Sequence, residues 1–240
     1  MEKNSAEEAL IEAMFKAGAH FGYSKTRRHP SLKDSIFGTK NKNDILDLSR
    51  AVKELETAKI FVSSLSTSGK VLLFVGVKPE ARTKTHEVAM ALDMPYVILR
   101  WVGGILTNWS EIKKRIARLL ELREQKAKGE LGKYTKKEQL LLDQEMTKMD
   151  SLFGGLVSLK KIPDAIFVVD AKREHIAVTE AHKAGIPIIA LVNSDTNKTG
   201  IDYPIVANDA SVSSISFFLD QIADAYKKGH LQVATVEPVQ

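Results

Sequence analysis

Short apolar runs alternate with helix-forming stretches along most of this chain, and this alternation limits the folds open to it. The strand-like runs lie at 70–77, 96–100, 165–170, 186–193 and 203–207. Helical patterns lie at 5–18, at 48–65, from Pro79 onwards, at 174–184 and at 212–228. Nearly continuous apolar strands are typical of parallel sheets buried on both faces. We therefore predict an α/β fold: a parallel Rossmann or flavodoxin-like sheet with helices on both faces.

One charged segment interrupts the alternation. A helical pattern over 108–128 is followed by a glycine-containing turn, and Thr135 with Glu138 then forms a capping box. Each helix has one narrow apolar stripe and a broad charged surface, which predicts a protruding antiparallel coiled-coil hairpin. The expected domains are an α/β domain over 1–107 and 154–230, a hairpin inserted at 108–153, and a flexible tail at 231–240. Because the stripe residues should pack mainly on each other, the sheet domain should fold without the hairpin.

The turn between a predicted strand and the first hairpin helix carries Arg100, Trp101, Gly103, Gly104 and Asn108. Glycine permits backbone angles and close approaches that a Cβ would block, so we assign both glycines to a structural turn. Asn108, with a glutamate three residues later, is expected to cap the helix beyond. The Arg-Trp pair could meet a phosphate or a base, or could be a surface ion-pair partner beside a core tryptophan.

The positive charge of the chain is concentrated near its N-terminus. The formal net charge is +5. Residues 23–42 contain six lysines and arginines against one aspartate, and 36–48 reads as extended or hairpin structure around Asn41–Asn43. A localised basic loop is the electrostatic footprint of a polyanion partner, although it could also be a solvated surface. There is no cysteine and no apolar run of membrane-spanning length, so we expect no disulfides, no membrane partner and a cytoplasmic location.

Catalytic and metal-binding motifs are weak. The Gly76–Pro79 turn leads from a strand into a helix without a nucleotide-binding glycine pattern. Asp170, Glu174 and His175 follow a strand, where they could act as acid and base or simply charge a helix start. Asn193 and the nearby aspartates, which are Asp195, Asp202 and Asp209, could offer oxygens to a hard cation. We predict no catalytic residues, no cofactor and no metal site, with the Asn193–Asp209 region left open.

Eight segments, in order from about Leu10 to Gly229, resemble the bacterial small-subunit ribosomal protein S-two family. The central one is Arg-Trp-Val-Gly-Gly-Ile-Leu-Thr-Asn at 100–108. The others include 12–22, 36–38 with 44–48, 73–78, 152–155, 163–170, 180–187 and 201–209. Two positions depart from the family pattern. Tyr23 stands where a second histidine is usual, and Arg27-Arg28-His29-Pro30 stands where Arg-Trp-Asn-Pro is common.

The resemblance implies a structural component of the small ribosomal subunit, without catalysis, cofactor or small-molecule substrate. It implies binding to small-subunit ribosomal RNA and neighbouring ribosomal proteins, including docking of the mRNA-binding protein S-one where that protein exists. Lysine and arginine contacts to phosphates would supply most of the affinity. The candidate contacts are Lys25, Arg27, Arg28, Lys33, Lys40, Lys42, Arg100, Lys113, Lys114, Arg118, Lys133, Lys136 and Lys137. The alternatives are a phosphosugar- or nucleotide-binding α/β enzyme or ligand-binding module, and a basic adaptor that never meets RNA.

Overall fold

The computed structural model describes residues 2–234 and is built on five parallel strands. These are β4 (Leu72–Val75), β5 (Tyr96–Val97), β6 (Ala165–Val169), β7 (Ile188–Val192) and β8 (Tyr203–Val206). Their order in the sheet is β5-β4-β6-β7-β8, and every pairing is parallel. This is the flavodoxin-like order, in which the direction of winding changes between β4 and β6. The predicted parallel sheet is confirmed.

Alternate residues of each strand point to opposite faces of the sheet and pack into two separate hydrophobic cores. Leu72, Phe74 and Phe167 pack on one face against α1 (Glu2–Lys16), α2 (Leu48–Thr67), α3 (Pro79–Ala91) and α7 (Val212–Ala234). Leu73 and Val75 point to the opposite face, where α6 (His175–Ala184) and the segment after β5 cover them. Because both faces are buried, the strands are apolar throughout, as the continuous runs in the sequence indicated.

A small antiparallel sheet precedes the main one. Its strands are β1 (Phe21–Ser24), β2 (Ile36–Lys40) and β3 (Asn43–Leu46), in the order β1-β3-β2. Lys40 pairs with Asn43, so the β2–β3 loop is the dipeptide Asn41-Lys42, with φ of 51° and 66°. Two positive φ values in a two-residue loop define a type I′ turn. The predicted hairpin is therefore confirmed, whereas β1 was not anticipated. Between β1 and β2 lie two short 3₁₀ helices, η1 (Lys25–Arg27) and η2 (Pro30–Ser35).

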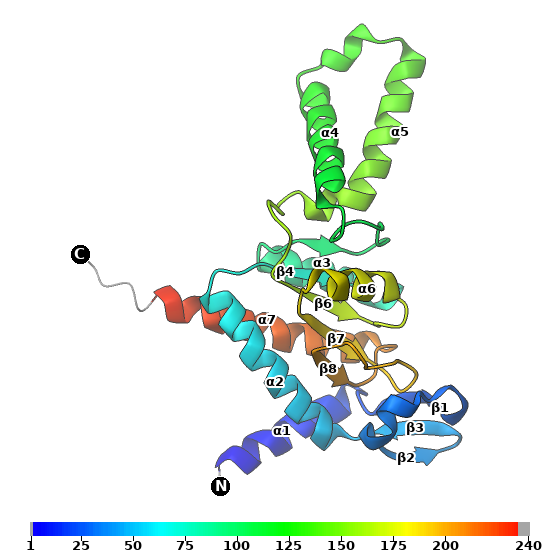
Figure 1. Ribbon diagram of the computed structural model, residues 1–240, viewed down its shortest axis with the longest axis vertical. Coiled ribbons are helices and arrows are strands. Elements are labelled where there is room, and N and C mark those ends of the chain that lie inside the picture. The colour runs from blue at the N-terminus through cyan, green and yellow to red at the C-terminus, as the bar shows by residue number, and fades with distance from the viewer. Residues whose placement is uncertain (1, 235–240) are drawn as a thin grey trace, which may run out of the picture.

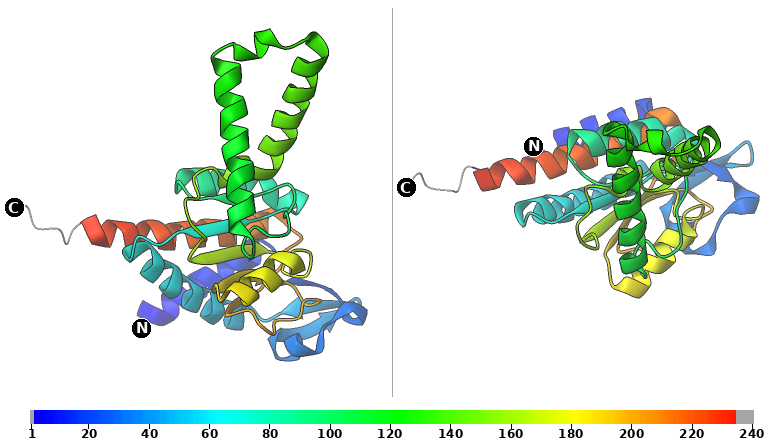
Figure 2. Two further views of the ribbon diagram at one scale, coloured as in Figure 1. Left: turned by 45° about the horizontal axis from the view of Figure 1, so that its top comes forward. Right: turned by 90° about the horizontal axis from the view of Figure 1, so that it is seen from above.

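Helices α4 (Trp109–Ala127) and α5 (Lys136–Phe153), joined by η3 (Glu130–Lys133), extend together away from the sheet (Figures 1 and 2). The Thr135–Glu138 capping box is confirmed. The expected Asn108 cap is wrong: its side chain accepts a hydrogen bond from the Ser110 hydroxyl and none from a helix N–H. A short side chain in reach of a neighbouring hydroxyl can satisfy itself locally in this way.

The apolar stripe of the hairpin is continuous with the core of the sheet. Ile112, Ile116, Leu119 and Leu122 of α4 are buried, and so are Met149 and Phe153 of α5. All six belong to the cluster that contains Leu73 and Val75. The stripe residues therefore do not pack only on each other, and the root of the hairpin is part of the domain core.

The C-terminal helix is longer than the sequence indicated. The expected flexible tail begins at 231, but α7 continues to Ala234, and 235–240 lie outside the described residues. Over the described part of the chain, no helix combines the length and apolarity needed to cross a membrane.

Candidate RNA interface

The turn between β5 and α4 is organised around a buried carboxylate from another helix. Gly104 has a φ of 97°, and its N–H donates to Glu180 Oε1 at 2.7 Å. The backbone N–H groups of Leu106 and Thr107 donate to Oε2 at 3.1 and 3.4 Å. Trp101 Nε1 adds a bond at 3.3 Å, and the Thr107 hydroxyl adds another at 3.3 Å. Glu180 on α6 thus fixes the shape of the turn.

The hydrogen bonds of this buried carboxylate favour its charged form. Burial alone would raise the pKa of Glu180, but the hydrogen bonds from Gly104, Leu106 and Trp101 outweigh it and lower that pKa. The ring of backbone donors that could hold a phosphate is therefore already filled by a carboxylate. Trp101 is buried and cannot stack on a base from outside. One feature of the sequence points to this role: Glu180 lies on the same helix face as the apolar Ala177 and Ala181, where a charged side chain is unusual.

Some of the basic side chains around this turn form ion pairs and others do not. Arg100 and Lys113 are exposed and form no ion pair within residues 2–234. Lys114 pairs with Glu111 at 2.7 Å, and Arg118 pairs with Glu121 at 3.0 Å. Such exposed pairs are weak, so both side chains remain able to exchange partners.

The N-terminal basic segment, defined as 23–42, contains the end of β1, both 3₁₀ helices and β2. Five of its six basic side chains are exposed and without an ion pair in the described chain: Lys25, Arg27, Lys33, Lys40 and Lys42. Arg27 lies over the Tyr23 ring, 5.9 Å from its centroid. The segment therefore presents a concentrated positive surface to solvent.

Arg28 is the exception in this segment. Its Nε and Nη2 donate to the two oxygens of the fully buried Asp44 at 2.8 and 2.5 Å, and Nη2 also donates to Thr39. The hydrogen bond from Arg28 is the main reason that the pKa of Asp44 is lowered. This geometry gives Arg28 a structural role, joining η1 to β2 and β3, and leaves it the weakest RNA candidate of the segment.

The remaining candidates lie far from that segment. Lys133, Lys136 and Lys137 are exposed at the tip of the hairpin, and Lys133 lies over the Tyr134 ring at 5.4 Å. Figure 1 shows the tip and the small sheet at opposite ends of the molecule. The thirteen candidates thus form separate surfaces: the small sheet, the root of the hairpin and its tip.

The crevice beside β4 and β6, where open α/β sheets bind ligands, is filled by side chains of the protein itself. Lys78 Nζ lies 3.1 Å from Asp170 Oδ2 and 3.4 Å from Asp209 Oδ1. It also lies 3.4 Å from the Tyr23 hydroxyl. Gly76 serves packing, because a Cβ there would lie 2.3 Å from Thr85 Oγ1. Lys78, Asp170 and Asp209 thus use their charges on each other and not on a phosphosugar or nucleotide.

The other polar groups considered for chemistry are also bound internally or isolated. Asp195 pairs with Lys172 at 2.7 Å, and Asp202 accepts from the Ile188 N–H. Glu174 is buried, and burial raises its pKa to about 7, while the adjacent His175 is exposed. Within residues 2–234, no three His, Cys, Asp or Glu side chains gather as a metal would require.

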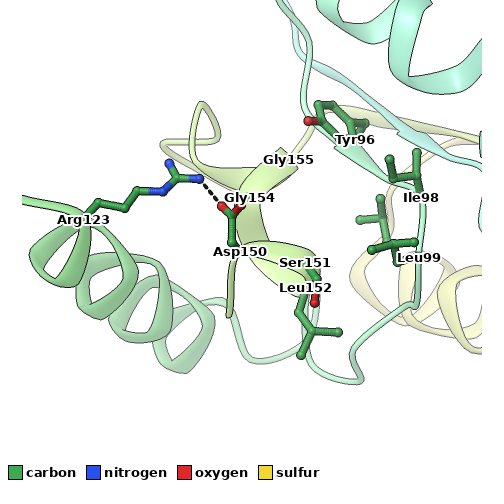
Figure 3. A pocket seen from close by; sticks show the side chains of 10 residues that line it. Tyr96, Ile98, Leu99, Arg123, Asp150, Ser151, Leu152, Gly154 and Gly155 are labelled. Atoms are coloured by element: carbon green, nitrogen blue, oxygen red, sulfur yellow. Dashed lines mark hydrogen bonds and ion pairs between the residues drawn. The ribbon is translucent and has the colours of Figure 1, made fainter. Parts of the chain in front are cut away.

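A polar hollow of about 180 Å³ lies between β5 and the base of α5 (Figure 3). An ion pair between Arg123 of α4 and Asp150 of α5 lies at its side. A Cβ at Gly155 would come within 2.3 Å of the Tyr96 carbonyl oxygen, so β5 and the chain after α5 are in close contact here. The hollow therefore results from the packing of the end of α5 and the following residues against β5.

Comparison with known proteins agrees with this architecture. The family model described as ribosomal protein S2 matches residues 14–229. The chain is 39% identical over 216 residues to the small ribosomal subunit protein uS2 of Pseudoalteromonas atlantica, covering 90% of this chain and 89% of that one. It is 40% identical over 229 residues to uS2 of Roseiflexus castenholzii, covering 95% and 87%. The chain belongs to the ribosomal protein S2 family.

Proposed function

We propose that this protein is a structural constituent of the small ribosomal subunit that binds small-subunit ribosomal RNA and neighbouring ribosomal proteins. Membership of the ribosomal protein S2 family supports this, and such proteins work in the cytoplasmic ribosome. The single structural observation that carries the RNA part is the set of exposed basic side chains in the segment 23–42 that form no ion pair within residues 2–234. Nothing favours the enzyme alternative, since the crevice at the switch in winding is filled by Lys78 and its partners.

The contacts proposed are electrostatic. Lys25, Arg27 and their neighbours on the small sheet form one contact surface, and Arg100 with Lys113 at the hairpin root forms a second. Exposed ammonium and guanidinium groups bind phosphates and displace counterions, which makes the affinity fall as salt rises. Folded RNA is recognised largely through its shape and backbone, so no base readout is required.

The hairpin over 108–153 is proposed to pack as a coiled coil and to reach RNA or protein remote from the sheet domain over 1–107 and 154–230. The paired apolar stripes of α4 and α5 support this, as do the ion pairs Arg123–Asp150 and Lys126–Asp143 between the two helices. The 19 residues of α4 give a reach of about 28 Å.

A protein partner is proposed for the exposed aromatic side chains near the small sheet. Phe21 is 54% exposed and Phe37 is 82% exposed, while Phe15 stacks on His20 with 60% of its own surface exposed. Large apolar groups exposed on a small sheet suit a protein contact. Where a cell contains S-one, we propose that S-one docks to the sheet domain at this aromatic surface.

The test is incorporation into subunits. Lys25→Glu with Arg27→Glu reverses two charges that make no ion pair in the described chain, so the fold should persist. The matched control is Lys227→Glu with Lys228→Glu on exposed positions of α7. Sucrose-gradient fractionation of lysates at several salt concentrations should show the first variant leaving the small subunit and the control remaining. Equal occupancy of the two variants at every salt concentration would contradict the proposed RNA contact.

A further inference from the structure

A surface hollow of about 440 Å³ lies where β1 meets the β2–β3 turn. Ser24, Lys25, Thr26 and Lys42 line it. The Lys25 N–H donates to the Lys42 carbonyl at 2.8 Å, and Ser24 pairs with Asn43 across the strands. Two segments separated by more than a dozen residues are thus held in a fixed relation, with a lysine on each side of the hollow.

Lys42 stands where the backbone favours a different residue. It is the second residue of the type I′ turn, with a φ of 66°. Glycine is the usual choice there, and a side chain in this conformation is strained. Asn41, at 51°, is a residue type that tolerates the conformation, but lysine is not. Strained positions that keep a side chain cluster at functional sites, so Lys42 is a candidate for a binding role.

The chemistry of the hollow suits an anion with an apolar part. Lys25 and Lys42 make no ion pair anywhere in residues 2–234. The nearby Asp44 carboxylate is bound by Arg28 and Thr39 and so offers little repulsion. Ser24 Oγ and Thr26 Oγ1 lie 2.9 Å apart, and their bond uses one hydroxyl proton and leaves the other able to donate. The lysine stems add apolar walls.

We propose that this hollow binds one phosphodiester of the RNA backbone together with its ribose. The ammonium groups of Lys25 and Lys42 contact the phosphate, and the Ser24–Thr26 hydroxyl pair donates one hydrogen bond to it. The sugar lies against the lysine stems, and the base is not read. This inference rests on the proposed function and names the part of the RNA that the small sheet holds.

The test uses two glycine variants of the same turn. Lys42→Gly and Asn41→Gly each place glycine at a positive-φ position, so neither should lower the melting temperature. Only Lys42→Gly removes a charge. Binding of the purified proteins to small subunits depleted of this protein is measured from 50 to 300 mM salt. We expect Lys42→Gly and Lys25→Ala each to weaken binding. Because both lysines contact one phosphate, the slope of log affinity against log salt should fall by no more than about 0.7–0.9 for the two together.

A double variant completes the design. If both lysines hold one phosphate, Lys25→Ala with Lys42→Gly should lose less than the sum of the single losses in log affinity. If Lys42→Gly binds like Asn41→Gly at every salt concentration, the inference is overturned, while the proposed function stands. If the wild-type protein shows no salt-dependent binding to depleted subunits, the proposed function itself fails.

Discussion

The Gly104 N–H donates to the Glu180 carboxylate across 2.7 Å, and this bond ties the root of the hairpin to α6 on the sheet. Helix α4 begins at Trp109, only five residues after Gly104. A change in the angle of the turn would therefore be carried along the whole hairpin. The same contact explains both a glycine at positive φ and a buried glutamate that has no ion-pair partner in the described chain.

The two glycines of the turn should respond differently to alanine. Gly104→Ala places a Cβ at a φ of 97° and should lower the free energy of unfolding by roughly 1–2 kcal/mol. Gly103→Ala should be tolerated, because its φ is not positive and its Cβ would lie 3.8 Å from Glu180 Oε1, an ordinary contact. Urea unfolding of the purified variants gives the comparison, and equal stability of the two would show that backbone strain does not matter here.

Glu180→Gln should destabilise the turn at neutral pH. The substitution removes the negative charge that accepts hydrogen bonds from the Gly104 N–H, the Leu106 N–H and Trp101 Nε1. Loss of these charge-assisted bonds should lower the free energy of unfolding by about 1.5–3 kcal/mol. Because the folded pKa is lowered, the stability that Glu180 contributes is present above its unfolded pKa and is lost as pH falls through the folded value. Glu111→Gln, at an exposed position of the same region, is the control and should change melting little. A Glu180→Gln protein that melts like the control would argue against an ionised anchor.

Much of this fold could be predicted from the sequence, because local pattern determines it. The buried strands and the Thr135 cap depend on residues close in sequence. The contacts of Glu180 and Lys78 could not be predicted, since their partners lie more than fifty residues away in sequence. Asn108 failed as a predicted cap because Ser110 offers a competing hydroxyl. Of the candidate RNA contacts, only tertiary structure distinguishes Arg28, held by Asp44, from the exposed Arg27 beside it.

Glu174 should make stability fall as pH rises. Burial raises its pKa to about 7, so between its unfolded value of 4.5 and 7 the folded state holds a proton that the unfolded state has lost. Glu174→Gln should remove this fall and stabilise the protein at pH 8 by up to roughly 3 kcal/mol, with little effect at pH 4. Burial also raises the pKa of Asp209 to about 6, so Asp209 makes stability fall with rising pH in the wild-type protein and in Glu174→Gln alike. Thermal melts from pH 4 to 8 measure the difference, and parallel curves would refute it.

The adjacent arginines should separate stability from binding. Arg28→Ala leaves the buried Asp44 without its cation and should cost about 3 kcal/mol of unfolding free energy. Arg27→Ala removes only an exposed contact with the Tyr23 ring and should cost less than about 1 kcal/mol. Occupancy in small subunits should fall for Arg27→Ala without loss of melting temperature. The opposite pattern, with a stable Arg28→Ala protein, would mean that the Asp44 contact is not structural.

The root of the hairpin should unfold together with the sheet. Leu119 is fully buried in the cluster that contains Leu73 and Val75, whereas Leu141 is 55% exposed on α5. Leu119→Ala should lower the free energy of unfolding by about 2–5 kcal/mol in one cooperative transition. Leu141→Ala should change it by no more than about 0.5 kcal/mol. Calorimetry with far-ultraviolet circular dichroism distinguishes the alternatives. If Leu119→Ala instead gave a separate early loss of helix and an unchanged main transition, the hairpin would be an independent unit carried by the sheet domain.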